Sequence, residues 1–238
     1  SSIDMLPKLA TPKYDMIVPS SGESITYRPY VVREEKILLI ALESQDESAV
    51  EKAVMNIIKE CVESPINIKN LTTFDVEFIF VTLRSKSVGE GIKVNPSCTK
   101  CETPNEVRIN LEKVNVTNTE DVVDKHVKLT GDISLDLKWQ TMSDRLSDSQ
   151  RKTETDAIIN TIANSIETIY SGEEIFAAKN SKHAEMVDFV EGLNSDQFNN
   201  IIEVLAKQPM LNYKLEFDCS DCGEHNEKVL SGLVDFFQ

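Results

Sequence analysis

The chain has 238 residues, of which 40% are hydrophobic, and a formal net charge of −15. This composition predicts a folded, soluble protein with one large domain or two small ones, and no apolar run approaches the roughly 20 residues needed to cross a bilayer. A surface this acidic repels phosphates, which argues against nucleic acid as a partner and favours another protein. Solubility alone would also account for the charge.

The N-terminal segment is predicted to be an arm followed by a hairpin. Residues 1–13 contain two prolines and have no hydrophobic period, so we expect an arm that lies on a partner. Two short strands are expected at 14–18 and 24–28, because a cluster of proline, serine and glycine separates them.

Three helices are predicted next, and with the hairpin they should form a core. The first covers about 33–43 and is apolar nearly all round, as expected of a helix buried on several sides. The second opens with a predicted capping box that begins at Ser44, and Pro65 stops it. Cys61 lies on its apolar face and is interpreted as a small core residue. The third runs from about 72 to 89.

Charged residues surround the start of the first helix, at 28–30 and 33–36. They could form a surface that faces a partner. Acidic residues such as Glu34 and Glu35 also favour the first turn of a helix through the helix dipole, so a purely structural interpretation is sufficient and is preferred.

Two Cys-x-x-Cys turns are the strongest chemical signal in the chain. The first knuckle carries Cys98 and Cys101, the second carries Cys219 and Cys222, and 117 residues separate them. Two intervening residues allow both sulfurs of a tight turn to face one tetrahedral centre, and four thiolates form a closed structural zinc site. Each knuckle lies between two strand-like segments, as in a zinc ribbon.

Other interpretations of the cysteines remain open. Two disulfides would need an oxidising compartment, and no apolar signal stretch at the start of the chain argues for one. Four thiols without a metal are the second alternative. His225, three residues after Cys222, could compete with the cysteines as a ligand.

The segment 112–210 between the knuckles is predicted to be an inserted strand and helical subdomain. Strands are expected at 125–129 and at 133–139, where apolar residues alternate with polar ones and Trp139 is the expected anchor of the sheet face. Three amphipathic helices should follow. They are expected at about 158–170, with Ile166, Ile169 and Tyr170 on its apolar face, at 184–193, and at 194–208, with a cap at Asn194.

Several stretches resemble the baseplate hub subunit family of T4-like contractile-tailed bacteriophages. They are residues 26–30 (TYRPY), 32–44 (VREEKILLIALES), 71–90 (LTTFDVEFIFVTLRSKSVGE) and the ending 230–237 (LSGLVDFF). The resemblance is sharp over about 14–111 and general over 112–210. It implies a structural or assembly subunit that contacts other hub and tail proteins in the host cytoplasm. Such a subunit either acts only during assembly or stays in the tail baseplate. The family carries no catalytic site to transfer.

An enzyme is the weaker hypothesis. His126, His183 and His225 lie far apart in the sequence, and the phosphate-binding, dinucleotide-binding and zinc-protease motifs do not occur. A zinc ion with four cysteine ligands would have no open position for water, which catalytic zinc needs. No small-molecule substrate is therefore expected. The competing class is a cytosolic zinc-ribbon adaptor in transcription or nucleic-acid binding.

The predicted fold class is α+β, in four segments. An arm (1–13) precedes a first domain (14–111) with the hairpin, the helical block and the first knuckle. The insertion (112–210) follows, and the second knuckle and tail (211–238) should pack back on the first domain.

Overall fold

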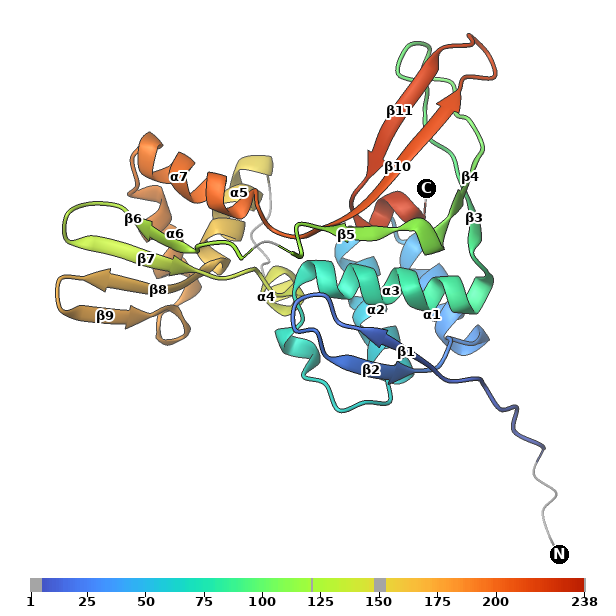
Figure 1. The fold of residues 1–238 in the computed structure, drawn as a ribbon, viewed down its shortest axis with the longest axis horizontal. Coiled ribbons are helices and arrows are strands. Elements are labelled where there is room, and N and C mark those ends of the chain that lie inside the picture. Colours follow the sequence, from blue (N-terminus) through green and yellow to red (C-terminus); the bar gives the residue numbers. More distant parts are fainter. Residues whose placement is uncertain (1–5, 121, 148–152, 238) are drawn as a thin grey trace, which may run out of the picture. The chain divides into compact units, whose positions relative to one another are not determined.

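A computed structural model describes residues 6–120, 122–147 and 153–237 (Figure 1). Part of the predicted arm, residues 1–5, lies outside this description. The chain forms two compact units, the first from 1–66, 77–114 and 213–238, and the second from 67–76 and 115–212. Both mix helices with small antiparallel sheets, which confirms the α+β fold class. The second unit also takes residues 67–76, which the predicted boundaries place in the first domain.

The first unit begins with the predicted hairpin, in which β1 (Tyr14–Ile17) pairs antiparallel with β2 (Ser24–Tyr27). Helices α1 (Val32–Glu43) and α2 (Glu47–Cys61) follow, and α3 (Thr73–Val88) starts in the second unit and continues in the first. Side chains from all these elements and from the end of the chain fill the core of this unit. Its most deeply buried members include Ile25, Tyr27, Leu38, Ile57, Ile58, Ile79, Phe80, Leu83 and Phe236.

The start of α2 differs from the prediction. Asp46, and not Ser44, caps the helix, because its carboxylate accepts a hydrogen bond from Ser48 N at 3.0 Å. Ser44 instead ends α1, where its hydroxyl donates to the carbonyl of Ala41 at 2.6 Å. Gln45 between them has a positive φ of 55°, so the chain turns once more before the next helix can begin.

The charged cluster at the start of α1 has one buried member, Glu34, whereas Arg33 and Lys36 are exposed. The Arg28 guanidinium lies 2.7 Å from the Glu34 carboxylate, whose side chain is only 3% exposed. The second oxygen of Glu34 accepts a hydrogen bond from Val31 N at 2.8 Å. Glu34 therefore satisfies the helix start and neutralises Arg28, which agrees with the structural interpretation of these two residues.

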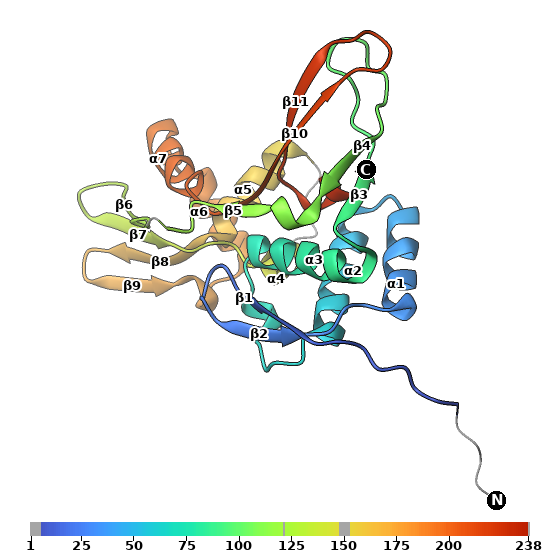
Figure 2. The same ribbon diagram turned by 45° about the vertical axis from the view of Figure 1, so that its right-hand side comes forward.

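Two further hairpins complete the first unit, and each carries one knuckle at its turn. Strand β3 (Gly91–Val94) pairs with β4 (Val107–Asn110), and β10 (Met210–Asp218) pairs with β11 (His225–Leu230). The two hairpins lie side by side with their turns together (Figures 1 and 2).

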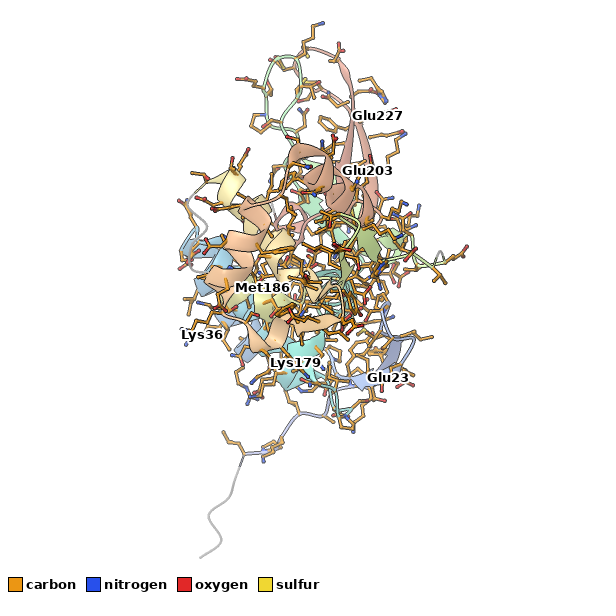
Figure 3. The ribbon with its side chains drawn as sticks, turned by 90° about the vertical axis from the view of Figure 1, so that its left-hand side faces the viewer. Glu23, Lys36, Lys179, Met186, Glu203 and Glu227 are labelled. Carbon is orange, nitrogen blue, oxygen red and sulfur yellow. The ribbon has the colours of Figure 1, made fainter. Side chains whose placement is uncertain are left out.

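The second unit is built on a four-stranded antiparallel sheet in the order β6-β7-β8-β9. The strands are β6 (His126–Lys128), β7 (Ile133–Leu137), β8 (Ile166–Ser171) and β9 (Glu174–Ala177). The helices of this unit are α4 (Met142–Ser147), α5 (Glu154–Asn164), α6 (His183–Glu191) and α7 (Ser195–Leu205). Helices α5, α6 and α7 share a core with the sheet, in which Leu135 and Ile201 are fully buried and Met186, labelled in Figure 3, is 6% exposed.

The helix predicted at 158–170 is wrong in its second half. Helix α5 ends at Asn164, and Ile166, Ile169 and Tyr170 lie on β8, where they pair with β7. Ser165 is the C-cap of the helix, and its hydroxyl donates to the carbonyl of Thr161 at 2.6 Å. The residues that follow are rich in β-branched and aromatic types, which favour a strand.

The remaining elements are short. Strand β5 (Asn115–Thr117) pairs antiparallel with the start of β10. Strand β7 ends at Leu137, so Trp139 lies beyond it, half-buried, with the Lys125 ammonium 4.9 Å from its ring centroid. Short 3-10 helices are η1 (Ile68–Asn70), η2 (Leu111–Lys113), η3 (Ala178–Asn180) and η4 (Leu233–Phe236). Among the helices in the described ranges, none has the length and apolar character needed to cross a membrane.

Candidate metal centre

The two knuckles have the same backbone hydrogen bonds. In the first, Cys98 N donates to Thr103 O at 2.9 Å and Glu102 N donates to Cys98 O at 3.0 Å. In the second, Cys219 N donates to Glu224 O and Gly223 N donates to Cys219 O at the same two distances. The residue after each second cysteine has a positive φ, 61° at Glu102 and 75° at Gly223. This repeated turn aims both cysteine side chains of a knuckle the same way.

The four cysteine sulfurs converge. Cys98 Sγ lies 3.7 Å from Cys222 Sγ, Cys101 Sγ lies 3.6 Å from Cys219 Sγ, and all four sulfurs lie within 4.8 Å of one another. Four sulfurs about 2.3 Å from a tetrahedral ion would be separated by about 3.8 Å, so the two short distances match the edges of such a site. They are too long for disulfide bonds, which join sulfurs at about 2.05 Å.

Hydrogen bonds prepare two of the sulfurs for the thiolate form. The pKa of Cys219 is lowered to about 6 because the backbone N–H groups of Cys222 and Asp221 point at its sulfur and the Asn105 amide adds a third donor. The pKa of Cys98 is also lowered, by the backbone N–H groups of Cys101 and Lys100 and by Asn226. Thiolates, and not thiols, are the ligands of metal ions.

The fourth thiol shows the cost of placing so many thiolates together. The Glu224 N–H lowers the pKa of Cys222, but partial loss of water around the sulfur and contact with the three other cysteines outweigh it and raise that pKa to about 12. Repulsion between the thiolates therefore opposes loss of the last proton when no cation is bound. A dication offsets this repulsion. The donor set is all sulfur and closed, which suits zinc in a structural role and leaves no ligand position for water.

Two residues of this centre, Asn105 and Asn226, were not predicted from the sequence, and the side chain of each reaches from its own knuckle to the other. The Asn226 amide nitrogen lies 3.5 Å from Cys98 Sγ, and the Asn105 amide nitrogen lies 3.6 Å from Cys219 Sγ. A signal was present in the sequence, because each asparagine stands seven positions after the first cysteine of its own knuckle.

His225 is placed with carboxylates and not with the cysteines. Its Nδ1 lies 2.8 Å from the Asp218 carboxylate, which raises the pKa of the imidazole. With Glu216 and Glu227 it forms an exposed group on β10 and β11, of which Glu227 is labelled in Figure 3. The Lys214 ammonium already lies 3.1 Å and 3.5 Å from these two glutamates, so their charge is partly compensated.

The other two histidines lie in the second unit and have partners of different kinds. His126 Nδ1 lies 2.7 Å from the Asp136 carboxylate, and the Tyr170 hydroxyl donates to the other oxygen of that carboxylate, also at 2.7 Å. His183 Nε2 lies 2.9 Å from the Asn160 side-chain oxygen.

Comparison with known proteins connects this architecture to phage tails. The model of the family described as T4 bacteriophage base plate protein matches residues 11–238. The chain belongs to this family. It is also 25% identical over 226 residues, 95% of its length, to the baseplate hub assembly protein gp26 of Enterobacteria phage T4, of which the match covers 97%. No solved structure matches the chain. The family membership confirms the resemblance found in the sequence, and it extends through the region 112–210.

Proposed function

We propose that this protein is a non-enzymatic structural or assembly subunit of a phage tail baseplate hub. The observation that carries the proposal is the family match over residues 11–238, supported by a relative named as a baseplate hub assembly protein. The protein acts by docking to other hub and tail proteins. It meets them in the host cytoplasm during assembly and has its place at the tail baseplate.

The proposal includes a structural zinc ion held by Cys98, Cys101, Cys219 and Cys222. The ion joins the hairpin β3-β4 to the hairpin β10-β11, which come from distant parts of the chain. Because metal sites of this kind rarely exist in an unfolded chain, the affinity for the ion contributes to folding stability. In this role the ion stabilises the docking-competent form and takes part in no reaction.

Co-expression with individual baseplate hub proteins of the same phage, followed by capture through an affinity tag on this chain, tests the proposal. Co-purification of at least one hub protein in a defined ratio is the expected result. An unrelated acidic phage protein carrying the same tag is the control for charge-driven capture. Failure to associate with any hub protein would remove the main support.

A nucleic-acid shift assay at moderate salt separates this proposal from a zinc-ribbon adaptor. With a net charge of −15, the chain lacks the excess of lysine and arginine that drives phosphate binding. We expect no shift with double-stranded or single-stranded DNA or RNA. Salt-dependent binding without association with hub proteins would favour the adaptor.

A further inference from the structure

The two asparagines of the metal centre make equivalent contacts, each with the other knuckle. Asn226 Oδ1 accepts hydrogen bonds from Thr99 N at 2.9 Å and from the Thr99 hydroxyl at 3.0 Å. Asn105 Oδ1 accepts a hydrogen bond from Ser220 N at 2.8 Å. Thr99 and Ser220 both directly follow the first cysteine of their knuckle.

The amide nitrogens make matching contacts as well. Asn226 Nδ2 donates to Glu224 O at 3.0 Å and to Cys98 Sγ at 3.5 Å. Asn105 Nδ2 donates to Thr103 O at 2.8 Å and to Cys219 Sγ at 3.6 Å. A backbone carbonyl beside each nitrogen and a backbone N–H beside each oxygen fix the orientation of both amides, because the reverse orientation would set oxygen against oxygen.

Both side chains are buried, with 5% of Asn105 and 2% of Asn226 exposed. A buried amide without partners costs about 1–3 kcal/mol, so fully bonded amides in such places fix one arrangement of their surroundings. Here that arrangement is the position of the opposite knuckle. The asparagine of the second hairpin holds the first knuckle, and the asparagine of the first hairpin holds the second.

We propose that Asn105 and Asn226 are positioning residues of the metal centre, which lock the two knuckles crosswise and donate N–H···S bonds to the ligands Cys98 and Cys219. This inference rests on the metal centre proposed above. The asparagines connect protein to protein, so they bring the four sulfurs together before an ion binds. Their N–H···S bonds also withdraw charge from one thiolate in each knuckle. Outer groups of this kind typically change metal affinity by about 10–100-fold.

The test replaces each asparagine with aspartate in the full-length protein. Asn105→Asp and Asn226→Asp keep the oxygen that accepts from the opposite knuckle, but they replace the N–H donor with a charged oxygen that faces a thiolate. Competition against a chromophoric chelator measures zinc affinity, and each variant should bind zinc about 10–100-fold more weakly than the unchanged protein. Asn160→Asp is the matched control, because Asn160 is equally buried at 5% but bonds His183 in the other unit.

Cobalt provides a readout that a general loss of stability would not move. Because all four cysteines remain, Co²⁺ in both variants should keep the absorption of a tetrahedral four-thiolate site. Loss of the N–H···S bond raises the energy of the sulfur electrons, so the sulfur-to-cobalt charge-transfer band should move to longer wavelength. Asn160→Asp should leave the band unchanged.

Three results decide the inference. Weakened zinc binding with a shifted cobalt band in both variants supports it. Zinc affinities and cobalt bands that match those of Asn160→Asp overturn it, and the proposal of the metal centre is then unaffected. If the unchanged protein binds neither zinc nor cobalt, the proposed metal centre is wrong, and the inference drawn from it is wrong as well. Should an aspartate variant not fold, the smaller and uncharged Asn105→Ser and Asn226→Ser replace it and should show the same weakening.

Discussion

Cys101 Sγ lies 3.6 Å from Cys219 Sγ, although 118 positions separate the two residues in the chain. The contact closes a loop that contains most of the second unit. A cross-link stabilises the folded protein mainly by lowering the conformational entropy of the unfolded chain, in which the loop would otherwise be open. A metal ion at this place therefore acts on the whole chain and not only on the two hairpins.

Replacing one ligand should remove this cross-link. Cys219→Ser is expected to lower the bound zinc from one ion per chain to much less and to reduce the free energy of unfolding by about 5 kcal/mol, the chain-entropy value for a loop of this length. Cys61→Ser is the control, since Cys61 is a fully buried thiol outside the cluster. It should keep the zinc. Metal analysis and thermal unfolding check both, and an unchanged result for Cys219→Ser would contradict the cross-link.

Metal removal should have a comparable effect without any substitution. A strong chelator is expected to lower the unfolding temperature of the unchanged protein, and added zinc should restore it. His225→Ala should respond in the same way as the unchanged protein, because the imidazole bonds Asp218 and lies outside the four-cysteine group. Loss of zinc from His225→Ala would show that the histidine is a ligand.

The turn after each second cysteine predicts two opposite changes in stability. Glu102 has φ 61°, which costs a side chain about 1 kcal/mol that glycine avoids, so Glu102→Gly should be neutral to stabilising by up to about 1 kcal/mol. Gly223→Ala should destabilise by about 1 kcal/mol, through backbone strain alone, because an added Cβ would meet nothing within 4 Å. Denaturant unfolding of zinc-loaded protein measures both. A destabilising Glu102→Gly or a stabilising Gly223→Ala would contradict the equivalence of the two turns.

Glu34 should make stability depend on pH below neutrality. Burial raises the pKa of its carboxyl, but the hydrogen bonds from Arg28 and Val31 outweigh this and lower the pKa below its ordinary value. Its stabilising effect is therefore complete above the unfolded pKa of about 4.5 and is lost as the pH falls through the lower folded value. Glu34→Gln should cost about 2 kcal/mol at pH 7 and progressively less towards pH 3.

The matched control for this effect is Glu43→Gln, because Glu43 lies exposed on the same helix. We expect it to change the free energy of unfolding by no more than about 0.5 kcal/mol at either pH. A cost for Glu34→Gln that did not shrink on acidification would show that the carboxylate charge is not the stabilising feature.

Local signals predicted most of the first unit and both knuckles. Continuous apolar runs located α1 and α3, although α1 is not buried on several sides as predicted, since Leu39 and Ile40 are more than half exposed. The Cys-x-x-Cys pairs predicted that the four sulfurs come together. The cap of α7 was also predicted, since Asn194 and Gln197 bond each other's backbone N–H groups at 3.0 Å and 2.9 Å. The helices, the cap and each single knuckle depend on neighbours in the sequence. The meeting of the two knuckles does not, and it was predicted because four thiolates complete one tetrahedral site.

Features that depend on distant partners were missed. Ile166 and Ile169 fit the apolar stripe of α5 as well as they fit a strand, and only pairing with β7 decides between the two. Strand β5 is polar and exists because β10 offers it hydrogen bonds. Neither Asn105 nor Asn226 forms a motif by itself. Only an alignment of the two knuckles shows that each asparagine follows the first cysteine by seven positions.

The sheet of the second unit can be tested by truncating one core residue. Leu135 is fully buried on β7, between β6 and β8, so Leu135→Ala should destabilise the protein by about 2–5 kcal/mol. Ile175→Ala on the edge strand β9 is the control, because Ile175 is 69% exposed, and its effect should stay within about 0.5 kcal/mol. Similar effects of both changes would contradict the placement of this sheet.

The arm offers a test of docking that leaves the core untouched. Leu6 and Leu9 are 88% and 94% exposed, on a segment without helix or strand. Apolar side chains left in water are available to a partner, so Leu6→Asp with Leu9→Asp should weaken association with hub proteins about tenfold or more, while the unfolding temperature stays unchanged. Lys8→Asp, which alters charge between them, is the control and should have the smaller effect. Full association after both leucine changes would place the docking surface on the folded units instead.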